Sequence, residues 1–214
     1  SQSGSVKTDP LAYTMAGKPW INMNPLYNGF VYLLWSAGGA WLVTLIHVLA
    51  VLAAFIMMRR FANDWGGPLS QGLALLLCAR LMLPVFNPGP GAFFIFFTAL
   101  FLTLLYRVKN FNLLAVLLLI LQVLWTNMHP SFLFGPALIL FFAIENWQET
   151  RSASRTSMVT PLTTKLFGLS AAALLITLIN PNLINLHRHI LANWLVLMGK
   201  EHIEWVSLFS SFFP

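Results

Sequence analysis

The chain has 214 residues, of which 58% are hydrophobic and only 8% are charged, and its mean hydropathy is +0.75. Soluble domains carry about 25% charged residues, so this composition excludes an ordinary water-soluble fold and predicts an integral membrane protein. The net charge of +6 does not indicate a nucleic-acid partner, because the cations are spread over the predicted loops. A single cysteine, Cys78, excludes an intrachain disulfide. No cysteine–histidine spacing predicts a metal site, and no cofactor is expected.

The amino-terminal 39 residues predict an extracytoplasmic loop followed by an interfacial helix. Residues 1–22 are small and polar, and Trp20 is expected at the level of the lipid headgroups. Residues 25–37 carry aromatic side chains and predict a tilted or interfacial helix that ends at Gly38-Gly39. Because Ser1 is not an initiator methionine and no apolar core follows it, we expect the chain to be truncated at its amino terminus or to have lost a leading segment.

The remaining chain predicts an all-α fold, a polytopic transmembrane helix bundle with about six spans in residues 40–179. The predicted spans are residues 40–58, 69–85, 92–106, 113–125, 132–144 and 166–179. Glycine and proline clusters predict the turns between several of them, and the polar residues 145–165 predict a loop. Residues 180–214 predict an extracytoplasmic amphipathic segment that lies on the membrane surface.

The distribution of lysine and arginine predicts which end of the bundle is cytoplasmic. With the amino terminus outside, the cytoplasmic loops carry Arg59, Arg60, Arg107, Lys109, Arg151, Arg155 and Lys165, and the outer segments carry Lys7, Lys18, Arg188 and Lys200. Seven cations against four favour this orientation, because cytoplasmic loops are enriched in cations. Four of the five histidines then lie on the extracytoplasmic side, where we expect any chemistry to take place.

A short polar segment, residues 126–132, separates two of the apolar runs. Pro130 restricts the residues before it to extended geometry and can begin the next helix, so the sequence predicts a tight turn at the membrane surface. The turn would hold Asn127 and His129 at the interface. Its plainer interpretation is a polar connection that lets a helical hairpin re-enter the lipid.

Four motifs occur in order along nearly the whole chain. They read TDPLAYT (8–14) with GKPWIN (17–22), WTNMHPSF (125–132), LINPN (178–182) and IEW (203–205). Together they resemble motifs of bacterial polytopic membrane proteins of the C-type (GT-C) glycosyltransferase superfamily. The resemblance implies a polyprenyl-phosphate-linked sugar donor that is used on the outer face of the bacterial inner membrane.

That chemistry would use a carboxylate of the first loop as a base or to orient the acceptor, and cations to hold the lipid phosphate. His187 and Arg188 follow the LINPN motif closely and form a candidate phosphate clasp, whereas ordinary anchoring to anionic lipid is the alternative. The candidate residues are, for catalysis, Asp9, His129 and Glu204 and, for substrate binding, Asn127, Asn180, His187 and Arg188.

The chain also departs from the family pattern. Residues 23–25 replace a histidine–glutamate–tryptophan run, so an expected acid is missing, and Pro130 replaces a glycine. Two functions therefore stay open: a glycosyltransferase-like enzyme, or a non-catalytic accessory or scaffold subunit that contacts other membrane subunits. A transporter is a weaker third possibility, since only His47 and Arg80 offer ionisable groups within predicted spans.

Simple structural roles compete with these assignments at several positions. His47 is expected to be a buried, hydrogen-bonded histidine, and Arg80 to face the bundle interior or reach the interface. Asp9 before Pro10 is also typical of a turn. Four phenylalanines are predicted to form a lipid-facing or packing surface: Phe93, Phe94, Phe96 and Phe97.

Overall fold

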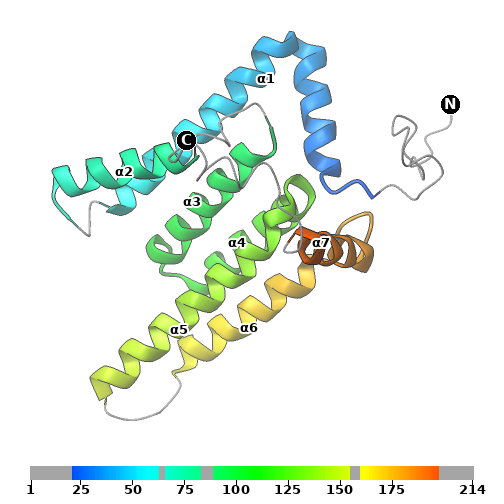
Figure 1. The fold of residues 1–214 in the computed structure, drawn as a ribbon. Helices are drawn as coiled ribbons and strands as arrows, with labels where there is room; N and C mark the ends of the chain where they lie inside the picture. Colours follow the sequence, from blue (N-terminus) through cyan, green and yellow to red (C-terminus); the bar gives the residue numbers. More distant parts are fainter. Residues whose placement is uncertain (1–20, 63–65, 83–88, 155–159, 198–214) are drawn as a thin grey trace. The chain divides into compact units, whose positions relative to one another are not determined.

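The computed structural model describes residues 21–62, 66–82, 89–154 and 160–197. All regular secondary structure in these residues is helical, as predicted (Figure 1). The helices are α1 (Pro25–Ala62), α2 (Pro68–Met82), α3 (Gly91–Arg107), α4 (Phe111–Met128), the 3-10 helix η3 (Pro130–Leu133), α5 (Phe134–Ser154), α6 (Pro161–Ile176) and α7 (Ile184–Leu197).

The chain divides into two compact units. One is Met23–Asn180, which holds α1 to α6, and the other combines Ser1–Asn22 with Pro181–Pro214 and holds α7. Within the second unit, the side-chain amide of Asn182 donates a hydrogen bond of 2.8 Å to the carbonyl oxygen of Asn22. The boundaries predicted at residues 39 and 180 stay a prediction.

Helix α1 is bent at Gly39, next to the predicted break (Figure 1). Gly39 has φ 62° and ψ −157°, a backbone conformation that side chains with a Cβ rarely adopt. The bend lets residues of the two arms meet, and the hydroxyl of Tyr27 lies 3.1 Å from Nε2 of His47. Glycine at position 39 thus shapes the first two apolar segments of the chain.

Three helical segments are long and apolar enough to cross a membrane: Pro25–Arg60, Phe111–Met128 and Pro130–Ser152. They indicate an integral membrane protein. Helices α3 and α6 are apolar but shorter, with 17 and 16 residues, and α2 has 15. At 1.5 Å per residue, 17 residues extend about 26 Å, slightly less than the hydrocarbon core of a bilayer.

Helices α3 to α6 pack around buried aromatic and aliphatic side chains. The indole of Trp125 is fully buried, stacks on Phe97 at 5.5 Å and meets Phe101 edge-on at 5.1 Å. Phe93 and Phe97 are buried, and Phe94 and Phe96 are partly buried. The predicted phenylalanine surface is therefore mainly a packing surface between helices.

The face of α4 that points away from the buried Trp125 carries exposed apolar side chains. Leu113, Val116, Ile120 and Leu124 recur every three or four residues and are 39–56% exposed. Leu114, Leu118 and Gln122 occupy the other face and are buried. An exposed stripe of this kind suits contact with lipid, whose tails are as apolar as leucine.

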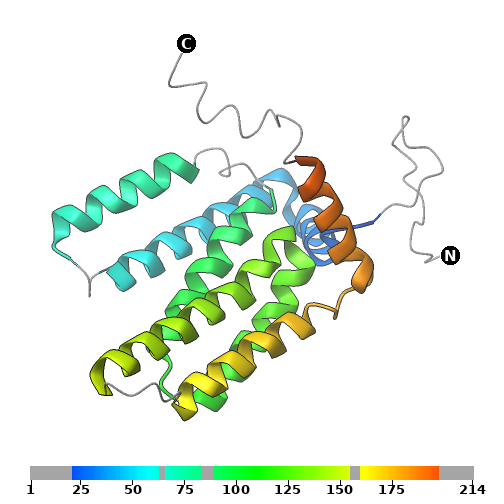
Figure 2. The ribbon, with the colours of Figure 1, turned by 60° about the horizontal axis from the view of Figure 1, so that its bottom comes forward.

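The interpretation of residues 145–165 as one polar loop was wrong. Helix α5 continues to Ser154, and α6 begins at Pro161 after an N-cap at Thr160. Figures 1 and 2 both show α5 and α6 running side by side. The polar side chains of residues 145–154 therefore lie on a helix at fixed spacing. Three of them, Glu145, Asn146 and Glu149, line a cavity.

Candidate functional site

The predicted turn between two apolar helices is present, and we call residues His129 to Leu133 the His129 turn. Helix α4 ends at Met128, His129 is extended with φ −153° and ψ 139°, and η3 begins at Pro130. Met128 was expected to be extended too, but it remains helical because proline restricts only the residue directly before it.

The imidazole of His129 is fixed by Ser131. Its Nδ1 accepts a hydrogen bond of 3.0 Å from the backbone N–H of Ser131 and lies 2.6 Å from the Ser131 hydroxyl oxygen. That hydroxyl also accepts a 3.2 Å hydrogen bond from the indole N–H of Trp125. Since Nδ1 accepts, the neutral ring carries its proton on Nε2, so Nε2 can act as a donor.

Burial also keeps this imidazole neutral. Desolvation lowers the pKa of His129 from 6.5 to about 4, because the charged form loses hydration in the packed turn. The ring stacks on Phe94 with 5.9 Å between centroids. At neutral pH, therefore, His129 offers a polarised N–H rather than a positive charge, and in the described part of the chain Nε2 has no hydrogen-bond partner.

Two of the predicted motif segments meet at this end of the bundle. The side-chain amide of Asn127, at the end of α4, donates a 2.9 Å hydrogen bond to the carbonyl oxygen of Ile179, which lies 52 residues further along the chain. Asn180 is buried and donates to the carbonyl oxygen of Thr177 at 2.8 Å. The structure thus brings Asn127, His129 and the 179–180 segment to the same end of α4 and α6.

The buried side-chain amide of Gln122 is hydrogen-bonded to the backbone of the His129 turn. Gln122 is fully buried, and its Nε2 donates a 2.9 Å hydrogen bond to the carbonyl oxygen of Phe132. Gly135 packs directly against the Gln122 side chain, where a Cβ would overlap Oε1 and would lie 3.1 Å from Phe101. Neither Gln122 nor Gly135 was predicted as a site residue, although a glutamine inside a predicted span is a signal for a buried polar contact.

The remaining predicted site residues lie outside the described residues or in the second unit. Asp9 and Glu204 lie outside the described residues. His187 and Arg188 lie on α7, in the second unit; His187 is partly buried and Arg188 is exposed. Nδ1 of His187 is 3.3 Å from the carbonyl oxygen of Leu183.

His47 and Arg80 differ sharply from one another. His47 is 3% exposed, and its Nδ1 lies 2.7 Å from the carbonyl oxygen of Val43 while Nε2 meets Tyr27. Both ring nitrogens are thus hydrogen-bonded within the protein, in agreement with the structural role expected for His47. Arg80 is exposed in the last turn of α2.

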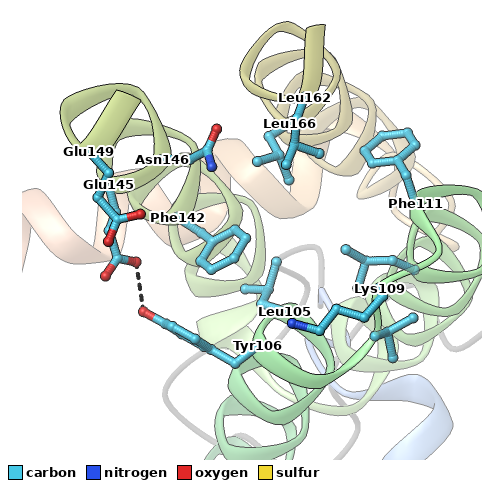
Figure 3. A pocket seen from close by; sticks show the side chains of 12 residues that line it. Leu105, Tyr106, Lys109, Phe111, Phe142, Glu145, Asn146, Glu149, Leu162 and Leu166 are labelled. Carbon is cyan, nitrogen blue, oxygen red and sulfur yellow. Dashed lines mark hydrogen bonds between the residues drawn. The ribbon is translucent and has the colours of Figure 1, made fainter. Parts of the chain in front are cut away.

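A cavity of about 340 Å³ lies near the first turn of α4, at the end opposite to the His129 turn (Figure 3). We call it the Tyr106 cavity. Leu114 in its wall and Met128 before the turn are 14 residues apart on α4, or about 21 Å. Its lining consists of Leu105, Tyr106, Val108, Lys109, Phe111, Leu114, Phe142, Glu145, Asn146, Glu149, Leu162 and Leu166.

Polar contacts order one wall of this cavity. The hydroxyl of Tyr106 donates a 2.7 Å hydrogen bond to Oε2 of Glu145, and Thr163 donates to Oδ1 of Asn146 at 2.7 Å. Sequence reasoning missed this site because Glu145 and Glu149 were placed in a loop. Their spacing of four residues puts both carboxylates on one helical face once α5 is known to continue.

In the described residues there is no group of three or more histidine, cysteine or acidic side chains that could hold a metal ion. Comparison with protein families, with characterised proteins and with solved structures found no match to this chain.

Proposed function

We propose that this protein is a membrane-embedded, glycosyltransferase-like protein that binds a polyprenyl-phosphate-linked sugar at the end of the bundle that carries the His129 turn. The proposal includes six crossings, with α2, α3 and α6 as short spans, and an extracytoplasmic location for this end in the bacterial inner membrane. The observation that carries it is the hydrogen bond from Asn127 to Ile179, because it joins the two central motifs of the family resemblance.

The chemistry of His129 fits a phosphate or sugar ligand. Its Nδ1 is occupied by Ser131, so Nε2–H can donate to a phosphate oxygen or a sugar hydroxyl. A neutral donor binds without the cost of burying a charge. In this proposal Asp9 and Glu204 keep the catalytic role, and Asn180, His187 and Arg188 keep the substrate-binding role, that the resemblance and the sequence pattern suggest.

A non-catalytic accessory subunit is the second candidate function. It is favoured by the placement of the acids, since the carboxylates of the described residues are Glu145 and Glu149, which line the Tyr106 cavity at the other end of the bundle. A subunit of this kind would bind the lipid-linked donor or a partner protein without transferring the sugar.

Binding of undecaprenyl phosphate to the purified protein in vesicles tests the site. His129→Asn keeps an acceptor near the position of Nδ1 but removes the Nε2 donor, so we expect roughly tenfold weaker binding. His129→Gln places an amide N–H near the position of Nε2 and serves as the matched control, with binding closer to that of the unchanged chain. Equal affinity for all three proteins would contradict the proposed role of His129.

Transfer is tested separately in cells that make the glycan. Asp9→Asn should abolish the glycan if the protein is an enzyme, whereas an unchanged glycan at normal protein levels would favour the accessory subunit. Undecaprenyl phosphate binding distinguishes this outcome from failure of the binding site itself.

A further inference from the structure

The Tyr106 cavity combines an apolar wall with charged groups at its rim. Leu105, Leu114 and Leu166 are buried side chains of three different helices that line it. Glu149 and Lys109 are exposed residues at its edge, and Glu145 is partly buried. The volume of about 340 Å³ lies within the range of small-molecule sites.

The two signs of charge occupy opposite sides of this cavity. Figure 3 shows Glu145 and Glu149 together on α5, and Lys109 across from them after the end of α3. Glu145 accepts the hydrogen bond from Tyr106, which leaves its remaining acceptor positions for another donor. No ion pair between these carboxylates and Lys109 is found in the described part of the chain, so the cavity keeps an unneutralised carboxylate side and an unneutralised ammonium side.

We propose that the Tyr106 cavity binds a zwitterionic phospholipid with a primary ammonium headgroup, of the phosphatidylethanolamine type. The ammonium donates hydrogen bonds to Glu145 and Glu149, and Lys109 holds the phosphate. The apolar wall contacts the first carbons of the acyl chains. A phosphocholine headgroup lacks the N–H donors, and a phosphoglycerol headgroup lacks the cation that the carboxylates require.

The position of the cavity brings lipid headgroups within reach. It is formed by the last turn of α3, the first turn of α4, the polar part of α5 and the beginning of α6, all close to the ends of apolar helices. Headgroups lie at the ends of membrane-crossing helices, where charged side chains meet them. This inference does not rest on the proposed sugar-donor site, which lies at the opposite end of α4.

Competition between lipids tests the proposal. The purified full chain in detergent is mixed with equal amounts of phosphatidylethanolamine, phosphatidylcholine and phosphatidylglycerol of identical acyl chains, and the retained lipids are counted by native mass spectrometry. We expect phosphatidylethanolamine to be retained in preference to both others. Glu149→Gln and Lys109→Gln should each reduce that preference, Glu149→Gln by roughly tenfold.

Arg151→Gln is the matched control, because Arg151 is an exposed charge on the same helix that lies over Trp147 and not in the cavity lining. It should keep the lipid preference. Equal retention of phosphatidylcholine and phosphatidylethanolamine, or an unchanged preference in both cavity variants, would overturn the proposal. Displacement of the lipid by soluble phosphoethanolamine at an equal concentration would also overturn it, since the acyl chains would then contribute nothing.

Discussion

The two ends of α4 hold their polar side chains in opposite ways. At the carboxyl-terminal end, Gln122, Asn127 and His129 bond to nearby backbone or to Ser131, and one donor, Nε2 of His129, is left over. At the amino-terminal end, the polar groups surround the Tyr106 cavity and leave room for a ligand. A closely packed turn can present a single group accurately, whereas an open, charged cavity can enclose a ligand.

If the His129 end of α4 depends on close packing, side-chain volume added there should lower the free energy of unfolding more than volume added at an open position. Gly135→Ala forces a Cβ onto the Gln122 amide and close to Phe101, so we expect the free energy of unfolding to fall by about 3 kcal/mol. Thermal or denaturant unfolding in detergent measures the change. Gly168→Ala is the control, because a Cβ there meets nothing within 4 Å, and it should leave stability unchanged or slightly raised. Equal effects of the two substitutions would contradict the packing described here.

Acid should destabilise this end through His129. The pKa of His129 is lowered by burial from 6.5 to about 4 in the folded chain, so between these values the unfolded chain binds more protons. The stabilising contribution is complete above pH 6.5 and is lost as the pH falls toward 4, by about 2 kcal/mol between pH 7.5 and 5. His129→Asn should lack this part of the pH dependence. The same loss in both proteins would show that other groups cause it.

Removal of the Ser131 hydroxyl should have a smaller effect. Ser131→Ala leaves the buried indole N–H of Trp125 without its acceptor, so we expect a loss of about 1 kcal/mol. Ser36→Ala is a suitable control, because the Ser36 hydroxyl is exposed and donates only to the carbonyl oxygen one turn earlier. Unfolding curves recorded side by side decide the matter, and no difference between the two variants would contradict the role of Ser131.

The cavity end should tolerate charge removal. Glu149 is exposed at the rim, so Glu149→Gln should change the free energy of unfolding by less than about 0.5 kcal/mol, although it changes lipid retention. A large loss of stability would mean that the carboxylate supports the fold rather than a ligand.

Local signals in the sequence predicted the His129 end well. The break at Gly38-Gly39 was predicted from the conformational freedom of glycine, and the turn before Pro130 from the restriction that proline imposes; the structure has a bend at Gly39 and the turn at Pro130. The predicted orientation placed Asn127 and Asn180 on the same side of the membrane, but the contact between Asn127 and Ile179 was not predicted. Helix ends were harder to predict than turns, because an apolar run need not reach the end of its helix. Helix α5, for example, continues to Ser154, beyond the apolar run 132–144.

The Tyr106 cavity could not be predicted from local patterns. It draws residues from α3, α4, α5 and α6, so it depends on how four helices pack. The polar composition of residues 145–154 also favoured a loop, although contacts such as the hydrogen bond from Thr163 to Asn146 hold α5 and α6 together there. Tertiary contacts of this kind override local propensity.

In the orientation that we propose, the His129 turn lies on the extracytoplasmic side and the Tyr106 cavity lies on the cytoplasmic side. Single cysteines test it in a Cys78→Ser background, which removes the native thiol. Leu133→Cys places an exposed thiol directly before α5, and Gln148→Cys places one in the polar part of α5. With a membrane-impermeant maleimide on intact cells, we expect labelling of Leu133→Cys alone, and of Gln148→Cys only after permeabilisation. The reverse pattern would contradict it.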